Sequence, residues 1–352
     1  MLIIDGHLDL AMNALLWNRD LTRSAHAIRQ LEAGMAQKGR AAGTVALPDL
    51  RRGTIALTLA TVIARVHEGH RSGIDYFSHA AAYAQAQGQL AYYRQLERDG
   101  ALRLIRDAPA LNAHLAAWEA DDTDQPLGLV LCMEGADPIV APKQVVDWWD
   151  DGLRVLALAH YGPSAYAHGT ESEGPLTDQG RAILPLMEQL GMILDATHLC
   201  DESLAEALER FGGSVLASHS NCRALVPGDR QFTDDQLKQL IARNAVIGAA
   251  FDAWMLQPGW IKGRTTNERV TLDTVVDHID HVCQLAGNAR HAAIGTDLDG
   301  GYGTEQSPGD LDTIADLQNI PALLRARGYA DADIAAIMHG NWQRLLNRAL
   351  PQ

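Results

Sequence analysis

Short apolar segments that alternate with longer helical patterns constrain the fold of this 352-residue chain more than any other feature. Eight segments have the length and the β-branched content of buried strands, namely residues 2–5, 54–63, 127–134, 155–160, 192–196, 215–219, 245–251 and 292–297. Helical patterns occupy residues 25–37, 75–98, 144–150, 178–190, 202–211, 234–243, 272–286, 311–327 and 331–350. The repeated strand–helix order predicts an α/β protein.

The strand segments lack the regular polar alternation of a sheet that has one face in water. They should therefore form a parallel sheet covered by helices, and eight strand–helix units favour one closed (β/α)8 TIM barrel. Residues 64–125 are longer than one crossover helix needs, which predicts a helical insertion after strand 2. Two helical patterns after the last strand predict extra C-terminal helices. No linker or repeat divides the chain, so we expect a single domain over residues 1–352.

Local signals agree with several of the predicted helix boundaries. Thr233 and Gln236 have the spacing of a capping box, which opens a helix by satisfying its first backbone N–H groups. Gly191, Gly212 and Gly287 stand where three helices should end, and glycine is the residue that most readily adopts the left-handed conformation found there. These signals support the order of elements without fixing their packing.

Composition excludes several classes of function. Hydrophobic residues make up 47% of the chain, yet no apolar run approaches the roughly 18 residues that a membrane helix needs. The net charge of −15, from 44 acidic and 29 basic residues without a basic cluster, disfavours binding to nucleic acid or to a membrane surface. The four cysteines form no C-x-x-C pair and should be reduced and mostly buried. No secretory signal is visible, so we expect a cytoplasmic protein.

Polar residues that can bind metal ions follow most of the predicted strands. They are His7 and Asp9 in DGHLD, Glu134 in CMEGAD, His160 in ALAHYG, His198 in LDATHLC, His219 in LASHSNC and Asp297 in IGTDLDG. In a barrel the carboxyl ends of all strands meet on one face, where such folds hold their active sites. Imidazole and carboxylate groups are common ligands of divalent metals. The sequence therefore predicts a ring of metal-competent residues around one cavity.

Each of these residues also has a plain structural explanation. A histidine after a strand is often a hydrogen-bonded rim residue, Glu134 could cap a turn, and Asp297 could belong to a turn rich in Gly and Asp. Other histidines lie in helical patterns and are expected to face solvent: His26, His79, His114, His278, His281 and His339. His67 and His70 lie in the loop after strand 2, where they could contact a substrate or simply be solvated.

The order of motifs resembles the membrane (renal) dipeptidase family of binuclear zinc metallopeptidases. The motifs are DGHLD, EGA, LALAHYG, GMILDATH, ASHS, GDRQF and AIGTDLDG, with GNWQRLL near the end, so the resemblance extends from residue 5 to about residue 345. It implies an amidohydrolase-like (β/α)8 barrel. It also implies a zinc-dependent dipeptidase that hydrolyses small dipeptides, L-Xaa-D-Xaa as well as L,L.

The resemblance assigns five residues to two Zn²⁺ ions. His7 and Asp9 would bind one ion, His198 and His219 the other, and Glu134 would bridge the two. An anionic bridge offsets the repulsion between the cations, and together they lower the pKa of a shared water, so that a bridging hydroxide is available for attack. The absence of strand-end cysteines leaves coordination positions for water and substrate.

Three further residues receive catalytic or binding roles from the same resemblance. Asp297 would take a proton from the bridging water and deliver it to the departing amine. His160 would stabilise the oxyanion of the tetrahedral intermediate, and Arg230 in GDRQF would bind the substrate's terminal carboxylate. Without the resemblance, Arg230 reads as a surface arginine in a loop.

Several segments depart from the family pattern around these residues. Leu8 replaces a residue that is often polar, Glu134 is followed by Gly-Ala where Gly-Gly is commoner, and YGPSAYAHGT after His160 lacks the expected Asn. The FDAWML segment after strand 7 and RVHEGHRSG after strand 2 are also individual to this chain. Because these loops shape the pocket, the resemblance does not specify the preferred dipeptide.

Two other classes of function remain as alternatives. Another amidohydrolase-like activity, such as a lactonase, a deaminase or a phosphotriesterase, could use the same barrel, but those relatives commonly bridge their metals with a carbamylated lysine, and no lysine stands at a strand end here. A non-catalytic barrel should have a broken ligand set, whereas this set is complete. Neither a P-loop nor a G-x-G-x-x-G motif is present. The expected partner is a small dipeptide, with a homodimer as a candidate assembly.

Overall fold

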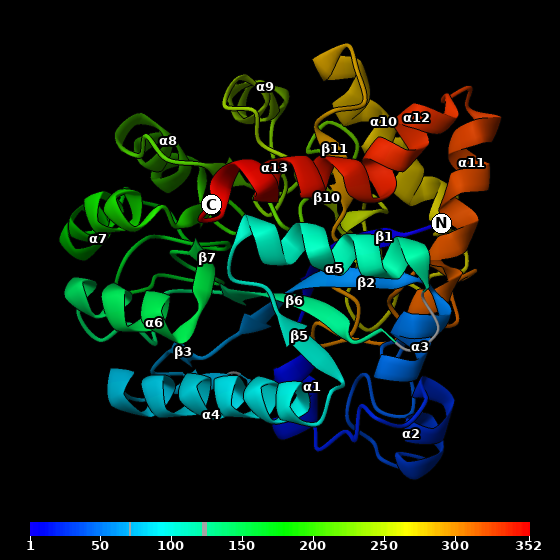
Figure 1. Ribbon diagram of the computed structural model, residues 1–352, viewed down its shortest axis with the longest axis horizontal. Coiled ribbons are helices and arrows are strands. Elements are labelled where there is room, and N and C mark those ends of the chain that lie inside the picture. The colour runs from blue at the N-terminus through cyan, green and yellow to red at the C-terminus, as the bar shows by residue number, and fades with distance from the viewer. Residues whose placement is uncertain (70–71, 122–124) are drawn as a thin grey trace.

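The computed structural model describes residues 1–69, 72–121 and 125–352, and it shows a barrel of parallel strands surrounded by helices (Figure 1). Eight strands of this described part build the barrel: β1 (Ile3–Leu8), β2 (Ile55–Val62), β6 (Leu127–Met133), β7 (Leu153–Ala157), β8 (Ile193–Asp195), β9 (Val215–Leu216), β10 (Ile247–Ala249) and β11 (Ala292–Ile294). Each of the eight predicted segments overlaps one of these strands. The predicted (β/α)8 barrel is confirmed.

Hydrogen bonds set the order of the strands around the barrel. Parallel ladders join β1, β2, β6, β7, β8 and β9 in that sequence, and β10 pairs with β11. A parallel bridge between Ala217 and Ile247 connects β9 to β10. The ring closes where the backbone N–H of Asp297, just after β11, donates to the carbonyl of His7 at 3.3 Å. Because all strands run the same way, their carboxyl ends lie on one face of the barrel.

Helices follow the strands along the chain and lie on the outside of the barrel (Figure 1). The α-helices are α1 (Leu10–Leu15), α2 (Ala25–Leu31), α3 (Leu47–Arg52), α4 (His79–Arg98), α5 (Ala108–Ala120), α6 (Val145–Asp151), α7 (Asp178–Leu190), α8 (Asp201–Arg210), α9 (Asp234–Ala242), α10 (Leu272–Ala286), α11 (Ile320–Ala326), α12 (Asp331–Ala335) and α13 (Asn341–Ala349). Short 3₁₀ helices are η1 (Pro142–Gln144), η2 (Ala253–Met255) and η3 (Ile314–Asn319). The capping box of Thr233 and Gln236 is formed, and Gly191 and Gly287 end α7 and α10 in left-handed conformations.

The long segment between β2 and β6 contains α4, α5 and three short strands, β3 (Arg65–Val66), β4 (Asp75–Tyr76) and β5 (Leu102–Leu104). The prediction of a helix from residue 75 is wrong at its start, because Asp75–Tyr76 pairs with Arg65–Val66 and the helix begins at His79. Two predicted C-terminal helices are also divided. η3 precedes α11, and a single π-helical turn, η4 (Ala336–Gly340), joins α12 to α13.

α5 and α13 close the end of the barrel opposite the strands' carboxyl ends, and Figure 1 shows them side by side across it. Trp118 of α5 and Trp342 of α13 belong to one buried cluster with residues from the strands, including Ile4 and Ala293. The indole N–H of Trp342 donates to the carbonyl of Ile294 at 2.8 Å. This packing leaves the other end of the barrel for the polar residues.

Two expectations about side chains are tested by burial. His114 and His278 do not face solvent: they are 0% and 2% exposed, and they bond to the carbonyl of Ala56 and the N–H of Cys222. Their solvent-facing assignment is therefore wrong, because long-range packing covers them. All four cysteines are buried and free, as expected. Within residues 1–69, 72–121 and 125–352, no helix combines the length and apolar character that spanning a bilayer requires.

Candidate metal centre and active site

Glu134 lies at the centre of the residues that follow the strands. Its Oε2 lies 3.5 Å from Nε2 of His7, at the end of β1. Its Oε1 lies 3.1 Å from Nε2 of His198, 3.4 Å from Nε2 of His219 and 3.7 Å from Nε2 of His160. The two carboxylate oxygens therefore face different histidines, which is the arrangement required of a carboxylate that bridges two metal ions.

A second group of ligand atoms surrounds His7. Its Nε2 lies 3.8 Å from Oδ1 of Asp9 and 3.8 Å from Oδ1 of Asp297. This buried nitrogen has no hydrogen-bond partner among the residues that the structure describes. Nε2 atoms of His198 and His219 are 3.3 Å apart, close for two imidazoles unless a cation or a proton lies between them. These observations fit divalent cations at the site.

The geometry alone does not distinguish the five predicted metal ligands from the neighbouring His160 and Asp297. Three overlapping groups have ligand atoms within 4.8 Å of one another: His7, Glu134 and His219; Glu134, His160 and His198; His7, Asp9 and Asp297. His160 and Asp297 could thus also reach a metal. The structure brings all seven predicted strand-end residues together.

Hydroxyl groups orient the candidate ligands from behind. Ser218 Oγ is 2.9 Å from Nδ1 of His219, and Thr170 Oγ1 is 3.0 Å from Nδ1 of His198. The Thr61 hydroxyl donates to Oδ1 of Asp9. When Nδ1–H donates to such a hydroxyl, the lone pair of Nε2 is directed toward the centre of the site. Sequence reasoning did not find these three hydroxyl residues, because they lie outside the metal-competent residue types.

Two buried aspartates inside the motifs hold the strand ends together. Asp5 Oδ1 accepts the backbone N–H of His7 at 3.1 Å and that of Thr296 at 2.9 Å. Asp195 Oδ1 accepts the N–H groups of Thr197 and Ser218, each at 3.0 Å. Each carboxylate thus joins its own strand end to a neighbouring one. In the sequence, the signal that could have identified Asp5 and Asp195 is a charged residue within an otherwise apolar strand.

Close backbone contacts bring Ser218, and with it His219, toward the barrel interior. A Cβ atom added at Gly248 or Gly295 would lie 2.1 or 1.9 Å from the carbonyl oxygen of Ser218. Real Cβ atoms do not come this close to backbone oxygen. Glycine is therefore required at both positions for β9, β10 and β11 to meet beneath the site.

Two site residues have backbone conformations that non-glycine residues rarely adopt. The φ angles of His198 and Asp297 are 69° and 57°. Such a conformation costs about 1–3 kcal/mol per residue and persists where the surrounding contacts over-determine it. The backbone N–H of Asp297 and the carbonyl of His198 are held by His7 and Thr170, respectively. With this backbone, His198 Nε2 lies 3.1 Å from Glu134 and Asp297 Oδ1 lies 3.8 Å from His7 Nε2.

The histidines have different electrostatic surroundings. Burial lowers the pKa of His160 to about 4 and, aided by the charge of Arg230, lowers the pKa of His198 well below its usual value. Burial has the same effect on His219. For His7, burial acts in the same direction, but the carboxylates, Glu134 foremost, outweigh it and raise the pKa to about 10. The carboxylates around His7 therefore favour a positive charge at that position.

The pKa values of the carboxylates Glu134 and Asp297 are shifted in opposite directions. Burial alone would raise the pKa of Glu134, but the surrounding histidines, His7 first, hold that pKa well below its usual value. Asp297 is accessible to the cavity, with 16% of its side chain exposed, and burial raises its pKa well above the usual value. The surroundings of Glu134 therefore favour its ionised form, whereas burial of Asp297 favours its protonated form.

Arg230 also belongs to the site. It is 3% exposed, and its Nη2 donates to the carbonyl of His219 at 2.9 Å. Its buried Nη1 has no hydrogen-bond partner in the part of the chain that the structure describes. A buried guanidinium with a free N–H can accept an anionic group such as a carboxylate. Arg230 is therefore not the surface loop residue that its local sequence suggests.

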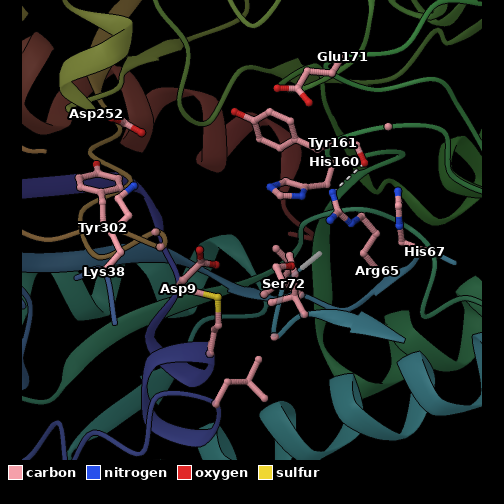
Figure 2. A pocket seen from close by; sticks show the side chains of 18 of the residues that line it. Asp9, Lys38, Arg65, His67, Ser72, His160, Tyr161, Glu171, Asp252 and Tyr302 are labelled. Carbon is pink, nitrogen blue, oxygen red and sulfur yellow. Dashed lines mark hydrogen bonds between the residues drawn. The ribbon is translucent and has the colours of Figure 1, made fainter. Parts of the chain in front are cut away.

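Two cavities meet at these residues. A cavity of about 110 Å³ is lined by Glu134, Arg230, Asp297 and neighbours. A wider one of about 670 Å³ opens outward, within the range of about 300–1,000 Å³ typical of small-molecule sites. Figure 2 shows His160 on the wall of the wider cavity. His67 also lines it, whereas His70 lies outside the described residues.

Comparisons with known proteins give a consistent assignment. Dipeptidase tcpJ of Claviceps purpurea is 31% identical over 199 residues, which are 55% of this chain and 44% of that protein. The chain spans about half the length of the first curated relatives that it matches. An uncharacterized protein in the pqqA 5′ region of Klebsiella pneumoniae is 30% identical over 275 residues, 75% of this chain and 96% of that protein.

The fold is also that of a solved metallopeptidase. A metallopeptidase of Rhodobacter sphaeroides, liganded with a phosphinate mimic of the dipeptide L-Ala-D-Ala, superposes with a TM-score of 0.81 at 22% identity, covering 99% of both chains. The family described as membrane dipeptidase (peptidase family M19) matches residues 1–350. Because this match includes nearly every residue, the chain belongs to the membrane dipeptidase family, peptidase family M19.

Proposed function

We propose that this protein is a zinc-dependent dipeptidase that hydrolyses the amide bond of small dipeptides. The observation that carries the proposal is the position of Glu134, whose two oxygens face separate sets of ligand atoms. In this assignment His7 and Asp9 would hold one Zn²⁺, His198 and His219 the other, and Glu134 would bridge them. The dipeptidases among the chain's relatives support the reaction class.

Two bound zinc ions would supply Lewis-acid polarisation of the scissile carbonyl and a water of lowered pKa. The protein's own groups then have to move a proton and hold the substrate. Asp297 is suited to the first task, because its carboxylate lines the small cavity beside His7. It takes the proton of the attacking water and delivers it to the departing amine nitrogen.

Binding and orientation are assigned to His160 and Arg230. The His160 imidazole lines both cavities, where an N–H can donate to the oxyanion of the tetrahedral intermediate. Arg230 offers its free Nη1–H to the substrate's terminal carboxylate. We further propose that a D-residue is accepted at the carboxyl-terminal position. The ligand of the Rhodobacter sphaeroides relative, a mimic of L-Ala-D-Ala, supports this.

We infer one catalytic domain over residues 1–352, which the extent of the family match supports. A cytoplasmic location fits the four free, buried cysteines, because reduced thiols are the rule in that compartment. Another amidohydrolase-like activity is the second candidate function. The position of Glu134 supports the dipeptidase, since here a glutamate would bridge the two ions, whereas those relatives commonly carry a modified lysine.

The test combines metal analysis with a dipeptide library that contains L,L and L,D members. We expect about two zinc ions per chain and cleavage of free dipeptides. Asp297→Asn should retain the metal and the fold yet lose about 10²–10⁴-fold in kcat. Asp178→Asn is the matched control, because that side chain is 102% exposed on α7. Less than one metal per chain with no peptide cleaved, or full activity of Asp297→Asn, would contradict the assignment.

A further inference from the structure

Asp252 is a buried carboxylate in the substrate cavity that the proposed mechanism does not use. It follows β10, is the N-cap residue of η2 and is 7% exposed. Its Oδ1 accepts Nε2–H of Gln306 at 2.7 Å and the backbone N–H of Trp254 at 3.4 Å. Both donors are neutral, and among the described residues no Lys, Arg or His forms an ion pair with Asp252. A buried charge without an ionic partner is costly unless a ligand supplies one.

The cations of the same cavity do not neutralise this carboxylate. Arg65 is committed to Asp75 at 2.6 Å, on the other side of the cavity. Lys262 is exposed and lies 5.2 Å from the ring centre of Trp254. Lys38 lies on the same side as Asp252 in Figure 2, but it too is exposed, so solvent screens its charge. Burial raises the pKa of Asp252 to about 6, and the charge of Lys38 opposes that rise only in part.

The position of Asp252 relates it to the reacting centre. It lines the wide cavity and also the small one, which it shares with Arg230, Glu134 and Asp297. Figure 2 shows Asp252 across the cavity from His160 and Tyr161. The small cavity thus presents a free guanidinium N–H and a buried carboxylate to one ligand. This combination suits a small molecule that carries both an anionic and a cationic group.

We propose that Asp252 forms a subsite for a cationic nitrogen of the substrate. The inference rests on the proposed dipeptidase function and names the chemistry that its substrates must carry. Two groups of a dipeptide have this chemistry, the free α-ammonium and a basic side chain. Either would form a charge-assisted hydrogen bond with the carboxylate. Asp252 lies in the FDAWML segment, one of the segments that depart from the family pattern.

Asp252→Asn is the sharpest variant for a test. An amide at this position still offers an oxygen to Gln306 and Trp254 and remains a good residue at a helix start, so the variant should fold. Only the charge is removed. Glu171→Gln is the matched control, because Glu171 is an exposed carboxylate that lines the same cavity. Thermal melts of both variants should lie close to that of the parent.

Six substrates distinguish the two sources of the cation: Ala-Ala, N-acetyl-Ala-Ala, Lys-Ala and Nle-Ala, and Ala-Lys and Ala-Nle, where Nle is norleucine. If the α-ammonium binds Asp252, the variant loses about ten- to hundredfold in kcat/KM on Ala-Ala, mostly through KM, but loses nothing further on the acetylated peptide. If a side chain binds, the parent prefers lysine to norleucine at one position by a similar factor, and Asp252→Asn abolishes that preference.

Changes below about threefold on every substrate, or equal losses in Glu171→Gln, would overturn the proposal. Equilibrium binding of non-hydrolysable phosphinate dipeptide analogues, with free and acetylated amines or with lysine and norleucine side chains, gives the same comparison without turnover. A protein that cleaves no dipeptide therefore refutes the proposed function. A protein that cleaves dipeptides, or binds the analogues, without regard to Asp252 refutes this inference alone.

Discussion

Replacing Arg19 by methionine should be the most destabilising single change to an ion pair in this protein. Arg19 is 1% exposed in its side chain and holds the loop that carries Asp297. Its Nη1 contacts Oδ2 of Asp299 at 3.2 Å and Oδ1 of Asn13 at 2.8 Å. Nε and Nη2 bind the two oxygens of Glu32 at 2.8 and 3.1 Å. One guanidinium therefore joins the chain segments that contain Asn13, Glu32 and Asp299.

The expected loss of unfolding free energy follows from the carboxylates that lose their partner when methionine replaces Arg19. Glu32 keeps Arg40 at 2.7 Å, but Asp299, 1% exposed, keeps only neutral donors from Thr44 and Val45. Removing one partner of a buried ion pair costs about 3–5 kcal/mol. With an unfolding entropy of about 2.1 cal/mol/K per residue over 352 residues, this corresponds to a fall of about 4–7 °C in Tm.

Arg210→Met is the control, because Arg210 also contacts a carboxylate, Glu206, at 2.6 Å, but its side chain is 51% exposed. Exposed pairs contribute about 0–1 kcal/mol, so this variant should melt within about 1 °C of the parent. Thermal melts followed by circular dichroism, at one fixed metal concentration, measure Tm for both variants, and urea titrations under the same conditions measure the loss of unfolding free energy. Adding Asp299→Asn to Arg19→Met should recover part of the loss. Equal small losses in Arg19→Met and Arg210→Met would refute the reasoning.

Two further predictions concern ligand orientation and acid stability. Thr170→Val removes the hydroxyl beside Nδ1 of His198 at similar volume and should weaken zinc binding about 10–100-fold in a chelator competition, whereas an unchanged affinity would show that the hydroxyl does not orient the imidazole. The Arg181 hydrogen bond lowers the pKa of Glu206 from 4.5 to about 2, so the stabilisation by Glu206 is present above pH 4.5 and is lost as the pH falls toward 2. The stability difference between the parent and Glu206→Gln should shrink over that range in urea titrations, and a difference that stays constant would contradict the assigned pKa.

The barrel and the residues at its strand ends could be predicted because both depend on local sequence. A short apolar segment between helices indicates a buried parallel strand, and this prediction does not depend on which segments lie beside it in space. Once eight such segments are ordered, topology alone places Glu134 and His219 at the same end. Helix boundaries were predictable where the capping chemistry is local, as at Thr233. The helix start at residue 75 was not, because Asp75 pairs with Arg65 from another segment.

The residues that orient and complete the site depend on contacts between distant parts of the chain. Thr61 is 52 residues from Asp9, and Thr170 is 28 from His198, so neither spacing carries a signal in the sequence. Arg230 lies in a loop whose sequence suggests the surface, and Asp252 is the one charged residue of the apolar FDAWML segment, yet both are buried beside the same small cavity. The strand-end residues can therefore be predicted from the barrel's geometry. The proposed substrate-binding groups Arg230 and Asp252 come from the loops, where the conformation of each chain determines which charges remain unpaired. Two barrels with the same five candidate ligands can thus differ in substrate through a single loop carboxylate such as Asp252.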